Sequence, residues 1–397
     1  MIPRRRAHMY AGEAEELAAW LRSGPPGAEE AVAELERAIA RYVGMPDAAA
    51  VSSGRQGMRL ILEHAGVGPG DEVVIPAYTL AELIPLIQQC GATVVAADID
   101  PATLNVTPAA VQARITPRTK AILVLHAFGA PADARAIAAM TAPRGIPVIE
   151  DCAHSLGATD NGLQTGGAGY AGFFSLEITK PVNSYGGGIA VSRDFSLTGH
   201  VRRGVAGAVI DPGHVPRKLR IIRLERILFS TGLAFPLLFL LANPASRALM
   251  HRLYRLWQHA TPPLLRYAPV QARVALKKLA TLDERIAVRN QRAALLASLL
   301  HPDIRVQRVR AGCTSAWYFF VALLPCPAAA VRRGLLLRGI DAAVEHEIAD
   351  DCAAWLGQHD CPNARDVFTR AIALPMFDGI DERTIERVAR TLNKLLA

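Results

Sequence analysis

The sequence predicts an α/β fold built on a mainly parallel, doubly wound sheet, with a smaller C-terminal α+β domain. Two observations indicate the sheet. Short apolar and β-branched runs recur along the first half of the chain, and stretches with helical periodicity separate the first four of them. This alternation is typical of parallel strands joined by crossover helices on both faces. The length of 397 residues exceeds one typical domain and leaves room for a second.

The expected elements follow in chain order. A helix is expected at 28–44, because apolar residues recur there with helical spacing and Gly44 ends the pattern. Strands are expected at six runs bounded by Gly, Pro or Asp, namely 71–77, 92–99, 120–126, 147–152, 169–176 and 187–192. The patterns of the remaining segments predict crossover helices at 79–91 and 131–145, one long amphipathic helix at 274–300, a strand at 315–324 and a helix at 328–340.

Composition and charge narrow the class of protein. The net charge of +8, from 44 basic and 36 acidic residues, favours anionic partners. Six cysteines without a CxxC pair indicate neither a disulfide framework nor a zinc site. The start of the chain is basic and then acidic and helix-forming, without the apolar core of a secretory signal, so we expect a cytoplasmic protein. No nucleic-acid partner is expected, because the basic residues gather around one apolar segment instead of forming a stripe with aromatic residues.

Three candidate functional segments follow predicted strands, where ligands of doubly wound sheets bind. The segment 51–66 opens a helix with a Ser and Gly turn, whose free backbone amides suit an anion. Asp151 and His154 end a strand expected to be buried, and a buried carboxylate needs a partner. Lys180 lies five residues after Ser175 and shortly before a triple glycine. The structural alternatives are a helix cap, a core histidine and a solvent-facing lysine.

Together these segments resemble the DegT/DnrJ/EryC1/StrS family of sugar aminotransferases, which use pyridoxal 5′-phosphate (PLP) and have the fold-type I transferase architecture. The resemblance covers about 12–195 well and 265–397 more weakly. The motifs that carry it are SGR (53–55), GPGDEVVIP (68–76), DIDP (98–101), ITPRTKAI (115–122), HAFGAPAD (126–133), VIEDCAH (148–154), FSLEITK (174–180) and GGG (186–188).

The resemblance implies a role for each candidate residue. Lys180 would hold PLP as a Schiff base and then act as the base that moves a proton. Asp151 would pair with the pyridinium nitrogen, and His154 would lie beside the ring near its phenolate oxygen. The phosphate would be held by Ser175 and by backbone amides near Gly54 and Arg55.

Several residues depart from the family pattern. Arg55 replaces the usual Thr. Leu80 stands where an aromatic residue commonly stacks on the cofactor, which leaves Leu80 or Tyr78 to cover the ring. Leu264 stands where the family places an Asn that reaches the neighbouring subunit's phosphate, although Arg266 matches. The sequence therefore does not predict whether a residue of this segment reaches the neighbouring subunit's phosphate. A homodimer is still the expected assembly.

An apolar segment interrupts the resemblance and divides the chain. We expect a large PLP-binding domain at 1–204, an insertion at 205–263 and a small domain at 264–397. Residues 227–246 contain no charged residue and are flanked by basic ones. A crossing helix would place the two domains on opposite sides of a membrane. Two interpretations are left: a hairpin held through 217–256 at the cytoplasmic membrane surface, as a peripheral protein, or a helix pair buried against the body or the dimer partner.

The expected function is transfer of an amino group from an amino acid, with glutamate as the favoured donor, to a keto group of a nucleotide-linked or lipid-linked sugar. Such a reaction belongs to polysaccharide or glycolipid biosynthesis. A PLP-dependent sugar dehydratase is an alternative within the same fold, which Lys180 disfavours because such relatives carry His at that position. A non-catalytic, membrane-docked relative is the alternative from another class. The departures from the family pattern at Arg55, Leu80 and Leu264 support this alternative.

Overall fold

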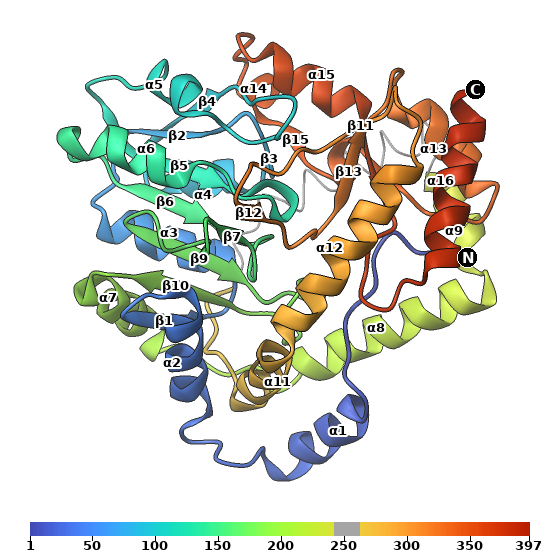
Figure 1. Ribbon diagram of the computed structural model, residues 1–397. Helices are drawn as coiled ribbons and strands as arrows, with labels where there is room; N and C mark the ends of the chain where they lie inside the picture. The colour runs from blue at the N-terminus through green and yellow to red at the C-terminus, as the bar shows by residue number, and fades with distance from the viewer. Residues whose placement is uncertain (242–262) are drawn as a thin grey trace.

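The computed structural model describes residues 1–241 and 263–397 (Figure 1). Its largest element is a seven-stranded sheet in the order β1-β10-β9-β6-β5-β2-β4. All pairings from β4 to β9 are parallel, and β10 runs antiparallel to both of its neighbours. The strands are β1 (Asp47–Val51), β2 (Glu72–Pro76), β4 (Thr93–Ala97), β5 (Thr119–Leu125), β6 (Val148–Asp151), β9 (Ala171–Ser175) and β10 (Gly188–Ser192).

Helices cover both faces of this sheet. Along β2, Val73 and Ile75 pack into one core cluster and Val74 into another on the opposite face. The first cluster includes α3, α4 and α7, whereas the second includes α5, α6 and residues of the small domain. Burial on both faces explains the unbroken apolar runs of these strands, and the predicted doubly wound α/β fold is confirmed. The helices are α2 (Ala31–Val43), α3 (Gly54–His64), α4 (Leu83–Gln89), α5 (Pro108–Gln112), α6 (Ala134–Thr141) and α7 (Phe195–Ala206).

A second, antiparallel sheet organises the C-terminal part. Its order is β11-β13-β16-β14, and helices α12, α13 and α16 close a separate core against it. The predicted strand at 315–324 is shorter than expected, because Trp317 has a left-handed φ of 44° that delays its start to Phe320. The strands are β11 (Arg305–Val306), β13 (Phe320–Leu323), β14 (Ala343–Val344) and β16 (Ala371–Leu374), and the helices are α12 (Leu282–Leu299), α13 (Ala328–Leu336), α14 (Cys352–Trp355), α15 (Pro362–Arg370) and α16 (Glu382–Leu396).

Short strand pairs and turns connect the two sheets. β3 pairs with β15, and β12 joins β7 and β8 in a small three-stranded sheet. These elements are β3 (Tyr78–Thr79), β7 (Thr159–Asp160), β8 (Leu163–Gln164), β12 (Cys313–Thr314) and β15 (Asp350–Asp351), with 3-10 turns η1 (Ala127–Gly129), η2 (Ala142–Arg144) and η3 (Glu345–Glu347).

The single long helix predicted at 274–300 is wrong. The chain forms two helices there, α11 (Pro269–Ala280) and α12, separated at Thr281, whose φ of −110° and ψ of 9° are not helical. Arg285 makes the break stable, because its guanidinium donates 2.7 Å to the Lys278 carbonyl in the last turn of α11. Helix periodicity alone does not reveal such a side-chain cap.

The apolar insertion contains two described helices. α8 (His214–Thr231) and α9 (Ala234–Leu241) are separated by Gly232, which has a left-handed φ of 79°. α9 packs on α13, and Arg333 of α13 lies 5.1 Å from the ring centre of Phe239. None of the described helices has both the length and the apolar character required to cross a bilayer. Residues 242–246 of the apolar run lie outside the described residues.

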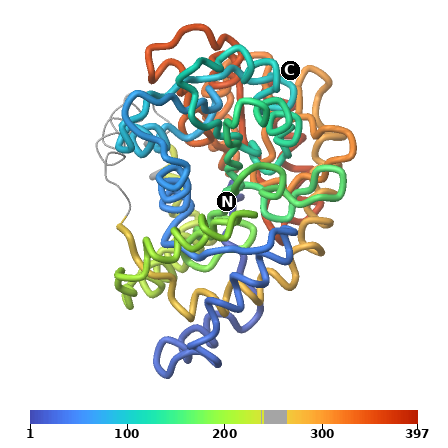
Figure 2. Tube along the Cα trace, turned by 90° about the vertical axis from the view of Figure 1, so that its left-hand side faces the viewer, coloured from blue at the N-terminus to red at the C-terminus, as the bar shows by residue number. Residues whose placement is uncertain are grey.

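Residues 1–10, here called the strap, run from the small domain past α8 to α1 (Glu13–Ser23) (Figure 1). Ile2 forms a parallel bridge with Ile340, and Arg4 pairs with Asp341 at 3.0 Å. In Figure 2, α1 projects at one end of the molecule, away from the main sheet. The strap therefore links the first helix of the chain to its C-terminal part.

Candidate active site

The candidate site lies at the edge where the parallel strands end. Asp151 is the last residue of β6, and Ser175 is the last residue of β9. β1 runs in the same direction as β9, because both are antiparallel to β10 between them. Gly54, at the start of α3 just beyond β1, therefore lies at the same edge. Three predicted segments meet here, as the carboxyl-end rule for such sheets requires.

Lys180 is held in a tight turn after β9. Its backbone amide donates 2.9 Å to the Glu177 carbonyl, and the residue is 9% exposed. The ammonium lies 4.1 Å from the ring centre of Tyr318. A lysine buried over an aromatic face loses most of its water, so the solvent-facing alternative does not describe this residue.

The triple glycine after Lys180 is required by close packing. Gly187 has a φ of 103°, and a Cβ there would lie 2.0 Å from Cε2 of Tyr267. A Cβ at Gly188 would lie 2.5 Å from the Gly54 amide nitrogen. The glycines therefore let the chain that follows Lys180 pass directly against the turn that opens α3.

Asp151 is a buried carboxyl group with few partners. Burial raises its pKa to about 6, although a hydrogen bond from the Ala153 amide at 2.9 Å and the positive charge of Lys180 act in the opposite direction. Its ionised form is therefore costly unless another cation faces it. A protonated ring nitrogen placed there would supply that cation.

His154 completes the buried side of the site. Its ring stacks on Tyr318 with centroids 4.2 Å apart and an interplanar angle of 13°. Burial, with the nearby charge of Lys180, holds its pKa well below the ordinary value, so the imidazole is neutral. Nδ1 is buried and has no hydrogen-bond partner among the described residues. An unpaired buried nitrogen of this kind indicates a missing polar partner.

The start of α3 faces Ser175. Ser53 caps the helix, since its hydroxyl accepts a hydrogen bond from the Gln56 amide at 3.2 Å. A Cβ built on Gly54 would lie 3.5 Å from that of Ser175, which shows how closely the two residues approach. A helix N-terminus beside a hydroxyl suits an anion. Arg55, in contrast, directs its guanidinium to Glu82 at 2.6 Å.

Tyr318 is a site residue that the sequence interpretation missed. Its hydroxyl lies 3.1 Å from that of Thr179. Burial raises the pKa of the phenol, but the charges of Lys180 and Arg5 outweigh burial and lower it to about 8. The sequence predicts a strand across the aromatic run at 317–320, whereas Tyr318 lies before the start of β13 at Phe320, where it contacts Lys180. The run of aromatic residues at 317–320 is the sequence feature that could have indicated Tyr318 as a site residue.

The residues that depart from the family pattern have defined positions. Tyr78 is buried, with its ring 5.9 Å from that of Phe128, whereas Leu80 is partly exposed. Leu264 is partly buried, next to Pro263, whose carbonyl accepts a hydrogen bond from Ser52 at 3.1 Å. The segment expected to reach a neighbouring subunit therefore lies beside the phosphate turn of its own chain.

His126 forms a structural pair at the end of β5. Its Nε2 lies 3.0 Å from Glu150, and its Nδ1 accepts a hydrogen bond from the Ala132 amide at 3.0 Å. Glu150 also accepts backbone amides of the 166–169 turn. Because both ring nitrogens are engaged, His126 ties β5 to β6 behind Asp151.

Comparison with known proteins identifies the family. A model of the DegT/DnrJ/EryC1/StrS aminotransferase family matches residues 8–218 and 243–393. L-glutamine:2-deoxy-scyllo-inosose aminotransferase of Streptoalloteichus tenebrarius is 32% identical over 311 residues, which are 77% of this chain and 66% of that protein. The chain thus spans slightly less than two thirds of this relative.

Solved structures agree with the fold. Aminotransferase TlmJ from Streptoalloteichus hindustanus has a TM-score of 0.79 and 25% identity, covering 100% of this chain and 99% of TlmJ. DesV from S. venezuelae has a TM-score of 0.72 and 25% identity, covering 96% of this chain and 93% of DesV. The motifs, the site geometry and these matches together show that the chain belongs to the DegT/DnrJ/EryC1/StrS aminotransferase family.

Proposed function

We propose that this protein is a PLP-dependent aminotransferase that carries an amino group from glutamate or glutamine to a keto group of a sugar. The observation that carries the proposal is the position of the Lys180 amine beside a buried carboxyl and a buried histidine with an unpaired nitrogen. Family membership supports the reaction class. The activity for which the relative from Streptoalloteichus tenebrarius is named supports glutamine as one donor and a cyclic ketone as one acceptor.

The residues at the sheet edge fit the cofactor that the family uses. When bound, PLP supplies an electron sink for the amino acid's Cα–H bond. Asp151 would hold the ring nitrogen and His154 would contact the ring through its unpaired Nδ1. Ser175 and the amides at Gly54 and Arg55 would hold the phosphate, because a helix N-terminus attracts anions.

The protein's own groups have separate tasks in this proposal. Lys180 holds and moves a proton at its Nζ, above the face of Tyr318. The Tyr318 phenol, held by Thr179, keeps water away from that amine and fixes the ring of His154 by stacking. Asp151 stays ionised only while a cation faces it, which ties the charge state of the site to its occupancy.

The two alternatives make different demands on the site. A sugar dehydratase of this fold lacks the lysine, whereas Lys180 is present and buried here. A non-catalytic relative would have no use for an amine, a carboxyl and an imidazole gathered at one edge. The side chain of Arg55 pairs with Glu82. The replacement of the family's Thr by Arg55 therefore leaves the backbone amides of the turn available to bind the phosphate.

We extend the proposal to the assembly and its location. The working organisation is a large domain at 1–204, the insertion at 205–263 and a small domain at 264–397, in a homodimer peripheral to the cytoplasmic membrane face. Two exposed apolar side chains of α8 support membrane contact, since Ile221 and Leu224 are 51% and 56% exposed. Exposed arginines at positions 217, 220 and 223 alternate with them, a composition suited to anionic lipid.

The first test is the visible absorption spectrum of the protein with PLP, before and after addition of glutamate or glutamine. We expect a yellow band that the amino donor bleaches. Lys180→Ala should lack both the band and the response, whereas Lys394→Ala, at an exposed lysine of α16, should behave as wild type. A wild-type protein that takes up no PLP would overturn the proposed function.

A further inference from the structure

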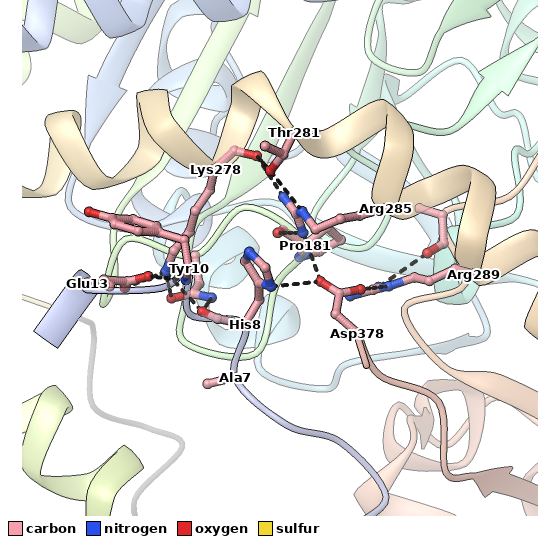
Figure 3. A network of polar contacts seen from close by, with 12 residues as sticks. Ala7, His8, Tyr10, Glu13, Pro181, Lys278, Thr281, Arg285, Arg289 and Asp378 are labelled. Carbon is pink, nitrogen blue, oxygen red and sulfur yellow. Dashed lines mark hydrogen bonds and ion pairs between the residues drawn. The ribbon is translucent and has the colours of Figure 1, made fainter. Parts of the chain in front are cut away.

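The carboxylate of Asp378, in the loop between β16 and α16, lies between two arginines of α12 (Figure 3). Arg289 donates to it through Nε at 2.6 Å, and Arg285 donates through Nη1 at 2.9 Å. All three side chains are at most 12% exposed. Burial raises the pKa of the Asp378 carboxyl, but the charges of Arg289 and Arg285 outweigh burial and lower that pKa. The carboxylate is therefore ionised at neutral pH.

The two arginines depend on this carboxylate. Arg285 and Arg289 are four residues apart on one helix, where like charges repel each other. The strap adds no further charge to the cluster. His8 Nδ1 lies 3.2 Å from Asp378, and burial, together with the charge of Arg285, lowers the pKa of His8 to about 4. Because the imidazole is neutral, Asp378 balances the two guanidinium groups.

Arg285 connects the carboxylate to the turn that carries Lys180. Its Nη1 donates at 2.8 Å to the carbonyl of Pro181, the residue directly after Lys180. The same nitrogen donates to Asp378, so the carboxylate fixes the direction in which Nη1 points. Figure 3 shows Pro181 and Asp378 on either side of the Arg285 guanidinium. The position of the Lys180 turn is therefore linked to Asp378.

Arg289 connects the carboxylate to the segment that leads into Tyr318. Its Nη1 donates at 3.4 Å to the Ala316 carbonyl. The next residue of α12, Asn290, accepts a hydrogen bond from the Trp317 indole at 3.0 Å. Trp317 has a left-handed φ of 44°, a conformation that a bulky residue keeps only where its surroundings hold it. Side chains of α12 thus hold the backbone just before Tyr318.

The two connected segments meet at Lys180. The Thr179 hydroxyl lies 3.1 Å from that of Tyr318, and the Lys180 amine lies 4.1 Å from the centre of the Tyr318 ring. The direct contact is therefore supported from behind by the Arg285–Asp378–Arg289 cluster. Without the carboxylate both guanidinium groups lose a shared partner, and the turn and the Tyr318 segment are no longer tied together through α12.

We propose that Asp378 is a positioning residue for Lys180. By fixing Arg285 and Arg289, its carboxylate holds the Lys180 amine over the ring of Tyr318. The inference rests on the proposed function, in which Lys180 is the reacting amine, and adds a residue that acts on Lys180 through two arginines. The competing interpretation is a purely structural cluster that stabilises the break between α11 and α12, which Arg285 caps through the Lys278 carbonyl.

Tyr318 reports the position of the Lys180 amine. The charges of Lys180 and Arg5 lower its pKa to about 8 against the effect of burial, while His154 on its other side is neutral. Burial raises the pKa of every other tyrosine that the structure describes. Ultraviolet titration of the full-length protein without added cofactor should therefore show one phenol ionising near pH 8. Tyr318→Phe should lack this step.

Asp378→Asn should raise the pH of this step by about one unit or more, because the Lys180 amine moves away from the phenol. The direct effect of the substitution has the opposite sign. Removal of a negative charge favours the phenolate and lowers the pKa of the phenol. The direction of the shift therefore separates positioning from a change of charge alone. A step that is unchanged or lowered in folded Asp378→Asn overturns the inference.

A second variant tests the cluster with its charge unchanged. Arg285→Lys keeps the positive charge but loses the planar fork that spans Pro181 and Asp378, so it should also raise the step. Circular dichroism verifies that each variant is folded. Where Asp378→Asn does not fold, Arg285→Lys carries the test, and a step equal to that of the wild type overturns the inference.

Two matched controls should leave the step unchanged. Asp381→Asn removes a carboxylate from the same loop, but asparagine caps α16 as well as aspartate does. Arg292→Lys changes another arginine of α12, which pairs with Glu382 at the surface. Shifts in these controls as large as in Asp378→Asn would show that any change near α12 moves the step, and would overturn the inference.

The spectral response of the PLP-loaded wild type to its amino donor separates the inference from the proposed function. A normal response, with an unshifted phenol step in Asp378→Asn, removes the positioning role and keeps the aminotransferase. A raised step in Asp378→Asn, in a protein that takes up no PLP, keeps the placement of Lys180 by Asp378 and removes the proposed function.

Discussion

Two buried lysines near the site differ in how completely they are bonded. Lys278 of α11 donates to Glu13 at 2.7 Å, to Asn183 at 2.9 Å and to the His8 carbonyl at 3.0 Å (Figure 3). Lys180 has no such cage among the residues that the structure describes: it lies over the face of Tyr318, with a side-chain hydrogen bond to that residue. The first lysine uses all three of its protons to join α1, α11 and the strap, whereas the second keeps protons free for chemistry. Burial alone therefore does not distinguish a structural lysine from a reactive one, but its bonding does.

The largest effect should come from exchanging the two lysines for methionine, one at a time. Lys180→Met should slow the half-reaction with the amino donor by at least about 10³-fold, because the base is lost. Its thermal midpoint should change little. Single-turnover absorbance and a melting curve measure both quantities. The measurement is made at a temperature where both variants are folded. If Lys278→Met then lost more half-reaction rate than Lys180→Met, the assignment of Lys180 as the reactive lysine would be wrong.

Lys278→Met should reduce the free energy of unfolding by about 3–5 kcal/mol, because Glu13 is left buried without its cation. Urea denaturation measures the change. The double variant Lys278→Met with Glu13→Gln should recover part of it, since the uncompensated charge is gone. A double variant as unstable as the sum of the two single variants would show that the pair does not interact.

Asp151→Asn should stabilise the protein without cofactor at neutral pH, by up to about 3 kcal/mol for a shift of about two pH units. A folded-state pKa of about 6, above the unfolded value, means that stability is lost as pH rises from about 4 to 6 and is constant above that. The wild type should show this loss, and the variant should lack it. Melting curves from pH 4 to 8 test the sign, which would be reversed if another group held the carboxylate.

The smallest effect is expected for Tyr318→Phe, which keeps the stacking on His154 and removes the hydroxyl near Thr179. The half-reaction rate should fall by about tenfold or less. Because the pKa of Tyr318 is lowered to about 8, the wild-type rate should change near that pH, and the variant should not. A pH profile of the single-turnover rate measures this, and an unchanged break in the variant would assign it to another group.

Sequence patterns predicted the elements whose position depends on residues close together in the chain. The six predicted strands occur within a few residues of their expected ends, because β-branched runs bounded by Gly and Pro determine them. β1 was not among them, since its Asp47–Val51 sequence is mostly alanine and has low strand propensity. Its place beside β10 is set by burial on the sheet.

The residues of the site also divide into those that local sequence patterns predict and those that contacts between distant segments bring into place. Asp151 and Ser175 end strands, Lys180 follows one, and the motifs around all three predicted them. Tyr318 reaches Lys180 only through the packing of the small domain, and the strap reaches Asn183 across 175 residues. Contacts between segments so far apart leave no local pattern in the sequence, so neither of these two contacts could be predicted.

The strap has a consequence for the order of folding during synthesis. Arg4 bonds to Glu347, which is 343 residues later in the chain. At the usual rate of synthesis the ribosome needs roughly 20 to 70 seconds to cover that distance. Throughout this interval the first ten residues have emerged without their partners in the small domain. The main sheet can form while they wait, and docking of the strap has to follow synthesis of the small domain.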